Sequence, residues 1–562
     1  MTTVVEPTLR QALAGALRAA LDRAVAAGEL PAEAATEPFI ERTRDPKFGD
    51  FASNVAMTLA RPLRKAPLQI AQAIARHVAL DGVVASVEVA PPGFLNLRVS
   101  DAWLRGRIGV VLEAGEGYGR APEPLTMPVL IEYVSANPTG PLHVGHGRWA
   151  ALGSTLANLL AWAGTPVLQE FYINDAGNQM LNLGRSVLYR LEGREIPAGE
   201  EGANFYGGAS IQDVADRARE AIAAELEGLD EDGKIARLTA FARDFYLEAQ
   251  ERTLARMKVS FDTWTSETTL HRSGEVERTL ERLKASGDVY EQDGALWLRS
   301  TAHGDDKDRV VIRDNGLPTY LAADIAYHAD KLARSGGTLL NIWGADHHGY
   351  VARIQAALAA LGHPAGSCEV LIGQLVSLFR DGEPVRMSKR TGEMVTLDEV
   401  LDEVGPDAAR YYLVMRGADT PLDFDLTLAK QETADNPVFY VQYAHARICS
   451  ILRLAEEQGL VAAPGPGDVE GLVEADERQL LLMIAAFPDE VRSAAQAREP
   501  HRIARYAQDL AAAFHQFYTT CRVIQPEQVA LTRARLALAA AARQTLACAL
   551  EGILGVSAPA KM

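Results

Sequence analysis

The sequence predicts an α/β protein built from an N-terminal α+β unit, a central unit with a parallel sheet, and a C-terminal all-α bundle. At 562 residues the chain is too long for a single hydrophobic core, so several domains are expected. In the middle of the chain, short apolar runs alternate with helical segments, which is typical of parallel sheets. From about residue 430 onward, helical periodicity continues without a strand pattern.

The first unit, residues 1–115, combines helices with a pair of strands. Residues 8–28 are rich in Ala and Leu and predict a helix. Residues 45–57 predict a Gly/Asp turn that leads into a second helix, and residues 83–100 alternate as strands do around a Pro-Pro turn. Residues 115–128 are rich in Gly and Pro, which predicts a linker and a domain boundary.

The second unit, residues 116–430, supplies the parallel sheet. Its predicted strands lie at residues 129–131, 164–175, 338–344 and 370–378. A Rossmann-like sheet of this kind binds its ligands beyond the carboxyl ends of the strands. Residues 185–300 are polar and charged, so we expect an insertion there, which ends in a hairpin with its turn at Asp293-Gly294.

The third unit, residues 431–562, predicts a helical bundle of about 130 residues. Its expected helices span residues 438–456, 477–495, 501–523 and 532–554. The most apolar stretch, Leu536 to Ala542, stops at Arg543 and is far too short to cross a membrane.

Composition and charge narrow the class of protein. The net charge of −18 argues against a generally basic surface for nucleic acid, although a local basic face suffices to bind RNA. The four cysteines are widely spaced and form no CxxC pair, so neither a zinc ribbon nor a disulfide framework is indicated. We therefore expect a cytoplasmic protein, because reduced cysteines are typical there and the N-terminus has no signal-peptide pattern.

The stretch from Ala136 to Arg148, ANPTGPLHVGHGR, lies between a predicted strand and a predicted helix. His143 and His146 share one face of the helix start, and Gly145 between them lets a ligand approach the backbone. Unsatisfied N–H groups and the positive end of the helix dipole favour phosphate there. The alternative is a pair of surface histidines that cap a helix.

A second motif, RMSKR, lies in the Gly-flanked loop at residues 383–393. Its Lys389 is a point charge on a flexible stem. Alone, a lysine in a polar loop is more often solvated surface. Paired with the histidine turn about 240 residues earlier in the same unit, it predicts a clamp for the two ends of a triphosphate.

Together the two motifs resemble the signatures of the class I aminoacyl-tRNA synthetases. HVGH is similar to their HIGH motif, and RMSKR is similar to KMSKS, with Arg386 in place of the first lysine. Five further segments resemble the bacterial arginyl-tRNA synthetases: NPTG at 137–140, NDAGNQ at 174–179, YLAADIAYHADK at 320–331, YVQYAHARI at 440–448 and the closing GVSAPAKM. The resemblance extends over essentially the whole chain.

This resemblance implies the ATP-dependent ligation of L-arginine to its cognate tRNA through arginyl-adenylate, with release of AMP and pyrophosphate. It implies that His143, His146 and Lys389 are the catalytic residues that stabilise charge on the phosphates. The implied ATP-binding residues are His143, Gly145, His146, Gly344, Asp346, Met387, Ser388 and Lys389. Mg2+ accompanies ATP in this chemistry, and the family needs bound tRNA even for the first step.

For arginine itself, the resemblance implies that Glu132 and Asp324 hold the guanidinium and that Asn137 and Tyr320 complete the site. The chemistry agrees, because a planar guanidinium pairs with carboxylates in fork geometry. Glu132 interrupts an apolar strand, which is costly without a partner. Asp324 follows Tyr320 by four residues, so the two share a helix face. The alternatives are an ordinary surface acid for Asp324 and a core tyrosine for Tyr320.

RNA contacts are implied in the first and third units. Phe94 and Asn96 share a strand face, where a base stacked on Phe94 can be hydrogen-bonded by Asn96. The alternative is a core phenylalanine with a turn asparagine. In the third unit the candidate contacts are Gln442, Tyr443 and Arg447, on a helix of which half must be core.

Two other functions remain open on the sequence. One is a different HxGH nucleotidylyltransferase or ligase, which needs neither terminal unit. The other is a non-catalytic tRNA-binding paralogue, which has no reason to keep the histidine pair and Lys389. We expect no structural metal, because Asp346-His347-His348 lacks a fourth clustered ligand. The expected partners are arginine tRNA, L-arginine and ATP, with a monomeric chain and no membrane.

Overall fold

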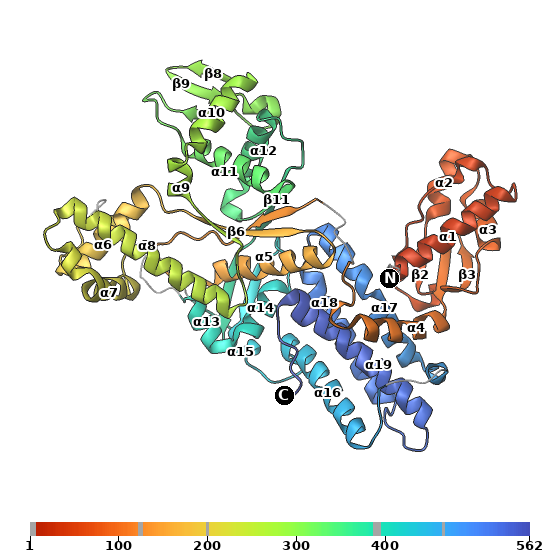
Figure 1. Ribbon diagram of the computed structural model, residues 1–562. Coiled ribbons are helices and arrows are strands. Elements are labelled where there is room, and N and C mark those ends of the chain that lie inside the picture. The colour runs from red at the N-terminus through yellow and green to blue at the C-terminus, as the bar shows by residue number, and fades with distance from the viewer. Residues whose placement is uncertain (1–6, 122–126, 198–201, 386–394, 463–466) are drawn as a thin grey trace.

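The computed structural model describes residues 7–121, 127–197, 202–385, 395–462 and 467–562. Figure 1 shows a central sheet above a bundle of long helices, with the N-terminal unit beside the bundle and two lobes projecting from the sheet. The predicted fold class is confirmed, because a parallel-sheet unit joins an N-terminal α+β unit to C-terminal helices.

The N-terminal unit contains a four-stranded antiparallel sheet in the order β1-β2-β4-β3. Its elements are α1 (Leu9–Ala26), β1 (Glu41–Arg42), β2 (Phe51–Ser53), α2 (Val55–Leu63), α3 (Pro67–Arg76), β3 (Val84–Ala90) and β4 (Phe94–Val99). The first predicted helix and the two strands around the Pro-Pro turn are confirmed. The predicted turn at 45–57 leads into α2 but also contains β2, which is too short to show an alternation.

The five strands of the central sheet all run parallel, in the order β12-β11-β5-β6-β7. They are β5 (Val129–Glu132), β6 (Val167–Ile173), β7 (Thr263–Ser266), β11 (Thr338–Gly344) and β12 (Cys368–Gly373). Three helices that pack around it are α5 (Val144–Trp162), α11 (Tyr320–Ser335) and α12 (Val351–Ala360). Because the strands point the same way, the turns that follow β5, β11 and β12 meet at one edge of the sheet.

Two predictions for this unit were wrong in detail. The insertion expected at 185–300 is not continuous, because β7 returns to the sheet within it. The β7 sequence, TWTS, has no apolar run, so the pattern hid it. The strand predicted at 370–378 is two strands, β12 and β13 (Val376–Arg380), in different sheets. The first ends at Gly373, where an added Cβ would lie 2.0 Å from the ring of Trp149.

Two lobes project from the sheet. The first lies between β6 and β7 and consists mainly of α6 (Asn178–Glu192), α7 (Ala209–Leu226) and α8 (Glu231–Arg256). The second contains α9 (Glu267–Arg272), α10 (Glu275–Ser286), β8 (Val289–Gln292), β9 (Ala295–Leu298) and β10 (Arg309–Ile312). The hairpin predicted there is confirmed, since Asp293 and Gly294 have φ values of 51° and 77°, as a type I′ turn requires.

A small sheet in the order β14-β13-β15 lies between the parallel sheet and the bundle. This region contains β14 (Glu383–Pro384), α13 (Leu397–Val404), α14 (Pro406–Val414), β15 (Leu422–Asp425) and α15 (Leu426–Ala429). Arg148 of α5 is fully buried and ties the region together. Its guanidinium donates to the backbone carbonyls of Gln374, Leu375, Gly417 and Thr420 at 2.7–3.2 Å.

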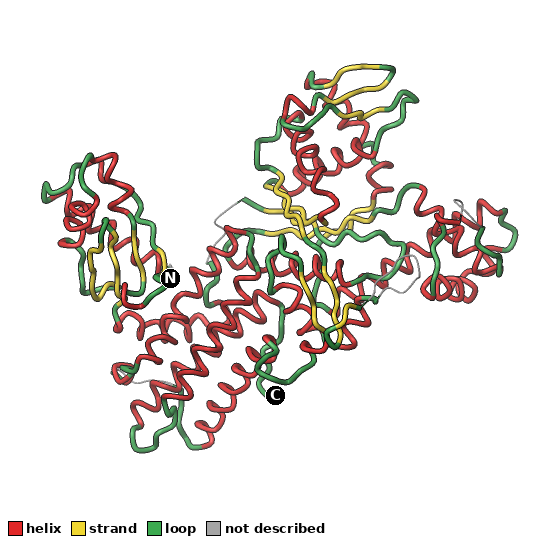
Figure 2. Tube along the Cα trace, turned by 180° about the vertical axis from the view of Figure 1, so that it is seen from behind, coloured by secondary structure: helices red, strands yellow, loops and turns green. Residues whose placement is uncertain are grey.

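The four predicted C-terminal helices are confirmed. Figure 2, which views the molecule from behind, shows them packed side by side. They are α16 (Pro437–Glu457), α17 (Ala475–Ala497), α18 (His501–Thr520) and α19 (Val529–Ala547). The helix α4 (Asp101–Ala114) packs against α17 and α19. One described helical stretch, Val529–Leu554, is long and apolar enough to cross a membrane, but 72% of its apolar window is buried inside the protein, as in a core helix.

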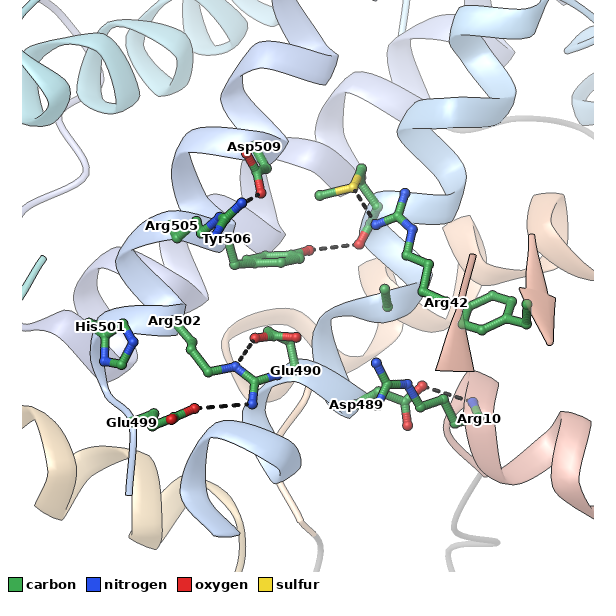
Figure 3. Close-up of a pocket in the computed structure, with 13 residues that line it drawn as sticks. Arg10, Arg42, Asp489, Glu490, Glu499, His501, Arg502, Arg505, Tyr506 and Asp509 are labelled. Atoms are coloured by element: carbon green, nitrogen blue, oxygen red, sulfur yellow. Dashed lines mark hydrogen bonds and ion pairs between the residues drawn. The ribbon is translucent and has the colours of Figure 1, made fainter. Parts of the chain in front are cut away.

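A cavity of about 390 Å³ lies where the N-terminal unit meets the bundle, as Figure 3 shows. The backbone N–H of Arg10 donates to Asp489 at 2.8 Å across this interface. The Arg42 guanidinium donates to the thioether of Met483 at 3.3 Å, and the Tyr506 hydroxyl donates to the carbonyl of the same methionine at 2.8 Å. No predicted site residue lines this cavity, so it belongs to the contact between units.

Candidate active site

The two motif histidines begin α5, as predicted. His143 is the N-cap residue and His146 lies one turn inside, with their rings stacked 3.7 Å apart at 23°. The backbone N–H of Gly145 donates to Nδ1 of His143 at 3.1 Å, and the N–H of His143 donates to Nδ1 of His146 at 3.3 Å. An amide N–H only donates, so each neutral ring carries its proton on Nε2. Both imidazoles therefore present an Nε2–H donor beside the positive end of the helix dipole.

The second motif lies outside the described residues. Residues 386–394 include Arg386, Met387, Ser388 and Lys389, whose placement is not described. The chain that follows lies directly on the histidine turn. Thr396 forms an antiparallel bridge with His143, and the N–H of Leu397 donates to the carbonyl of Leu142 at 2.7 Å. An added Cβ at Gly147 would lie 2.7 Å from the Leu397 side chain, so this contact is tight.

Glu132 is buried at the carboxyl end of β5, with 6% of its surface exposed. Its carboxylate accepts hydrogen bonds from the Lys331 ammonium at 2.5 Å and from the Ser135 hydroxyl at 2.9 Å. Lys331 comes from α11 and is itself fully buried. The partner that a charge in an apolar strand requires is therefore present, although the sequence did not identify it.

Asp324 lies on α11, on the same helix that supplies Lys331. The pKa of this carboxyl is raised to about 6, mainly by burial. A hydrogen bond from the Tyr350 hydroxyl lowers the pKa, and the nearby carboxylates of Glu267 and Glu132 raise it. An ordinary surface acid does not have these surroundings. The alternative that placed Asp324 on an exposed helix face is wrong.

Tyr320 and Asn137, the other two candidates for the arginine site, lie in different surroundings. Tyr320 begins α11 and is 70% exposed, so the alternative of a core tyrosine is wrong. Asn137 donates its side-chain amide to Gln179 at 3.1 Å, and its backbone carbonyl accepts from Gln250 at 3.1 Å. The turn that carries Asn137 is thus held by α6 and α8 of the first lobe.

Two acids near Tyr172, Glu267 and Asp175, were not among the residues predicted from the sequence. Burial and the carboxylates of Glu267, Asp324, Glu132 and Asp175 all raise the pKa of the Tyr172 hydroxyl, so these four acids surround it. Burial also raises the pKa of Glu267, partly offset by His271. Four carboxylates from different elements near one tyrosine favour a cationic ligand in this part of the protein.

The candidate nucleotide residues lie after β11. Gly344 ends this strand, and Asp346 follows in the short helix η6 (Ala345–Tyr350) with its side chain 81% exposed. An added Cβ at Gly344 would lie 2.6 Å from the Asp346 carboxylate, so glycine fits this approach. Asp346 and His347 form an exposed pair at 3.5 Å, and the described residues contain no group of three or more potential metal ligands.

The candidate RNA residues of the first unit lie on β4. Phe94 is 37% exposed and Asn96 is 7% exposed. Asn96 pairs with Ala52 and Glu88 on the neighbouring strands, so it is not a turn residue. Strand alternation places it on the same face as Phe94, as predicted.

The candidates of the third unit lie on α16. Arg447 places its guanidinium 5.1 Å from the ring of Tyr443 and 4.9 Å from the ring of Tyr518, and Tyr443 is 37% exposed. Gln442 instead donates to Asp407 at 3.1 Å and to the carbonyl of Ser557 at 2.9 Å. Its amide thus holds the C-terminal segment, whereas Tyr443 and Arg447 form a stacked surface pair.

The same three-part organisation appears in comparisons with known families. Residues 8–99 match the arginyl tRNA synthetase N terminal domain, residues 111–415 the class I (R) tRNA synthetase catalytic domain, and residues 441–562 the DALR anticodon binding domain. The chain belongs to the arginyl-tRNA synthetase family. It is 48% identical to the arginine–tRNA ligase of Symbiobacterium thermophilum, with 99% of each chain covered, and 47% identical to that of Bacillus subtilis, with 93% and 94% covered.

Solved structures of arginyl-tRNA synthetases have the same fold. The enzyme from Thermus thermophilus superposes with a TM-score of 0.75 at 27% identity, covering 99% of this chain and 100% of that one. A putative arginyl-tRNA synthetase from Campylobacter jejuni gives 0.74 at 36% identity, covering 83% and 100%. As a member of this family, the chain is an enzyme that ligates arginine to tRNA with ATP. An unrelated HxGH ligase would not match in all three parts.

Proposed function

We propose that this arginyl-tRNA synthetase activates arginine at the carboxyl edge of its parallel sheet, with the guanidinium bound between Glu132 and Asp324. One observation carries the proposal. The carboxylates of Glu132, from β5, and Asp324, from α11, lie near each other, and the turn that follows β5 carries the histidine pair. A planar cation is the group that pairs best with two such carboxylates. Asn137 and Tyr320 complete the site in this proposal.

The triphosphate then lies along the start of α5. An oxygen of the arginine carboxylate attacks the α-phosphorus of ATP, the bond to the β-phosphate oxygen breaks, and its electron pair leaves with pyrophosphate. The Nε2–H groups of His143 and His146 stabilise the charge that develops on the phosphates. Gly344 and Asp346 contact the nucleoside in this proposal, and Met387, Ser388 and Lys389, which lie outside the described residues, bind ATP with them.

In the second step, a hydroxyl of the terminal tRNA ribose attacks the arginyl carbonyl, and AMP leaves. No protein nucleophile is required. ATP enters as its magnesium complex, and we assign no protein ligand to that ion, because the described residues offer no cluster of ligands.

The tRNA lies across the other two units in this proposal. Phe94 stacks on an unpaired base that Asn96 hydrogen-bonds. Tyr443 and Arg447, with Gln442 beside them, contact the anticodon region. The proposed enzyme acts as a monomer, because one chain supplies both the carboxylates and the histidines. It acts in the cytoplasm, where free thiols such as its four cysteines are typical.

The decisive measurement is ATP–pyrophosphate exchange with each amino acid, with and without tRNA. Among the amino acids, only arginine should support exchange. This exchange should require added arginine tRNA. Exchange with a different amino acid but not with arginine would overturn the assignment of the pocket.

A further inference from the structure

A buried chain of hydrogen bonds runs behind the two carboxylates of the proposed arginine site. It begins at Glu132, whose carboxylate accepts from the Lys331 ammonium. The same ammonium donates to Oδ1 of Asn341 at 2.9 Å. Lys331 and Asn341 are both 0% exposed, and the ammonium lies 4.4 Å from the ring of Tyr327. Neither water nor substrate reaches these two side chains, so they act only through their neighbours.

The chain continues from Asn341 to the backbone of Asp324. The Asn341 amide donates to Nε2 of His328 at 2.9 Å, and Nδ1 of His328 lies 2.7 Å from the carbonyl of Asp324. A carbonyl only accepts, so Nδ1 carries the proton and Nε2 accepts. Burial and the nearby Lys331 charge both lower the pKa of His328, which keeps the ring neutral, as this pattern requires. Each hydrogen bond in this network therefore joins a donor to an acceptor.

The position of Asn341 in the sheet gives the chain its geometry. Asn341 lies in β11 and pairs in register with Glu132 of β5. Its neighbours Leu340 and Ile342 are apolar and buried, so a polar residue there is costly unless each of its groups is satisfied. Lys331 and His328 lie three residues apart on α11, on the face that meets this position. Three buried polar residues thus connect the two elements that carry the guanidinium carboxylates.

We propose that Lys331, Asn341 and His328 are positioning residues for arginine recognition, which fix the Glu132 carboxylate relative to the segment of α11 that carries Asp324. This inference rests on the proposed roles of Glu132 and Asp324. Lys331 occupies one oxygen of Glu132 and neutralises one of the two negative charges.

The test is a set of variants assayed by arginine-dependent, tRNA-supported pyrophosphate exchange. Asn341→Leu removes the hydrogen bonds of this side chain to Lys331 and His328 without changing the net charge of the protein. It should raise the KM for arginine about tenfold and leave the KM for ATP within about twofold. His328→Leu should act in the same direction. His328→Gln keeps an acceptor for Asn341 and should recover part of the loss.

Ser335→Ala is the matched control. It lies on the same helix and is also buried, but its hydroxyl donates to the Leu332 carbonyl and accepts from the N–H of Gly337, so its contacts stay at the end of this helix. Both KM values should stay unchanged. Thermal melting shows whether each variant folds, and the comparison of His328→Gln with His328→Leu decides the question if Asn341→Leu does not fold.

The outcomes separate this inference from the proposed function. If arginine supports exchange and the folded variants leave the ratio of the arginine KM to the ATP KM unchanged, the positioning role is wrong and the proposed site stands. A parallel rise in both KM values, or no difference between His328→Gln and His328→Leu, gives these residues a structural role only. Failure of arginine to support exchange in the unmodified enzyme instead removes the proposed function.

Discussion

The hydroxyl of Tyr350 donates a hydrogen bond to the carboxylate of Asp324, joining the short helix after β11 to the helix α11. This contact connects the proposed nucleotide side of the site to the proposed arginine side. It also holds Asp324 in one orientation, which a planar guanidinium needs.

Replacement of Asp324 by alanine should affect arginine far more than ATP. A half-buried carboxylate that pairs with a bound cation contributes several kcal/mol, so Asp324→Ala should raise the KM for arginine about a hundredfold. The KM for ATP should change little. Asp330→Ala on the same helix is the control, because Asp330 pairs with Arg334. Equal effects of Asp324→Ala on both substrates would remove Asp324 from the guanidinium pocket.

Arginine recognition should weaken in mild acid. The pKa of Asp324 is raised to about 6, so its carboxylate gains a proton as the pH falls through that value and loses its charge. The groups that face it are Tyr350, Glu267, Glu132 and Lys331. The KM for arginine should be constant above pH 7 and rise about tenfold per pH unit below 6. A flat profile between pH 5 and pH 7 would contradict this role.

Ionisation of the Asp324 carboxyl should lower the free energy of unfolding at neutral pH. Its folded pKa lies above the ordinary value of 3.8, so the ionised form is disfavoured in the folded protein. The cost is fully present above pH 6 and disappears as the pH falls below 4. Asp324→Asn should therefore stabilise the enzyme at pH 7 by up to about 3 kcal/mol. Denaturant titrations at pH 7 and pH 4.5 measure this, and Asp330→Asn should show no such gain.

The start of the catalytic unit should not tolerate a methyl group at Gly153. An added Cβ in this part of α5 would lie 2.2 Å from the ring of Tyr133, which is buried. Gly153→Ala should therefore destabilise the protein by about 1–3 kcal/mol. Gly106→Ala in α4 is the matched control, since nothing lies within 4 Å of its added Cβ. That control should stabilise by about 0.5–1 kcal/mol, and an equal gain at Gly153 would refute the contact.

Phe94 should matter for tRNA and not for the small substrates. Its ring is part-exposed on β4, so truncation leaves the core intact. Phe94→Ala should raise the KM for tRNA about tenfold, as expected for the loss of one stacked base. Ser86→Ala on β3 provides a comparison in the same sheet. Unchanged charging at limiting tRNA would count against the contact.

Local patterns predicted much of this fold. The strands β5, β6 and β11 are marked by apolar runs, and the four bundle helices by long periodic segments. The edge strand β7 escaped because TWTS has no apolar run. The break between β12 and β13 was not predicted because the carbonyls of Gln374 and Leu375 there bond to Arg148, which is more than 200 residues away in the sequence.

The candidate site likewise contains residues that local sequence predicts and residues that only distant contacts explain. The histidine pair was predictable because a strand, a glycine turn and a helix follow one another in the sequence. Glu132 was visible as a charge in an apolar strand, but its partner Lys331 is 199 residues further along the chain. Asn341 gave a comparable signal, an amide between buried apolar residues, and its meaning emerges only from the pairing of β5 with β11.

The adjacency of β6 and β7 has a consequence for the first lobe. The lobe leaves the sheet after Ile173 and returns at Thr263, and Ile173 pairs in register with Ser266 of the neighbouring strand. Its exit lies at the carboxyl end of β6 and its return at the amino end of β7, where Thr263 pairs with Glu170, so the connection must span the length of these parallel strands. Any replacement lobe must span that distance, and Gln179 and Gln250 are the residues by which this lobe is hydrogen-bonded to Asn137. A graft from a relative that keeps these two glutamines should leave arginine activation intact.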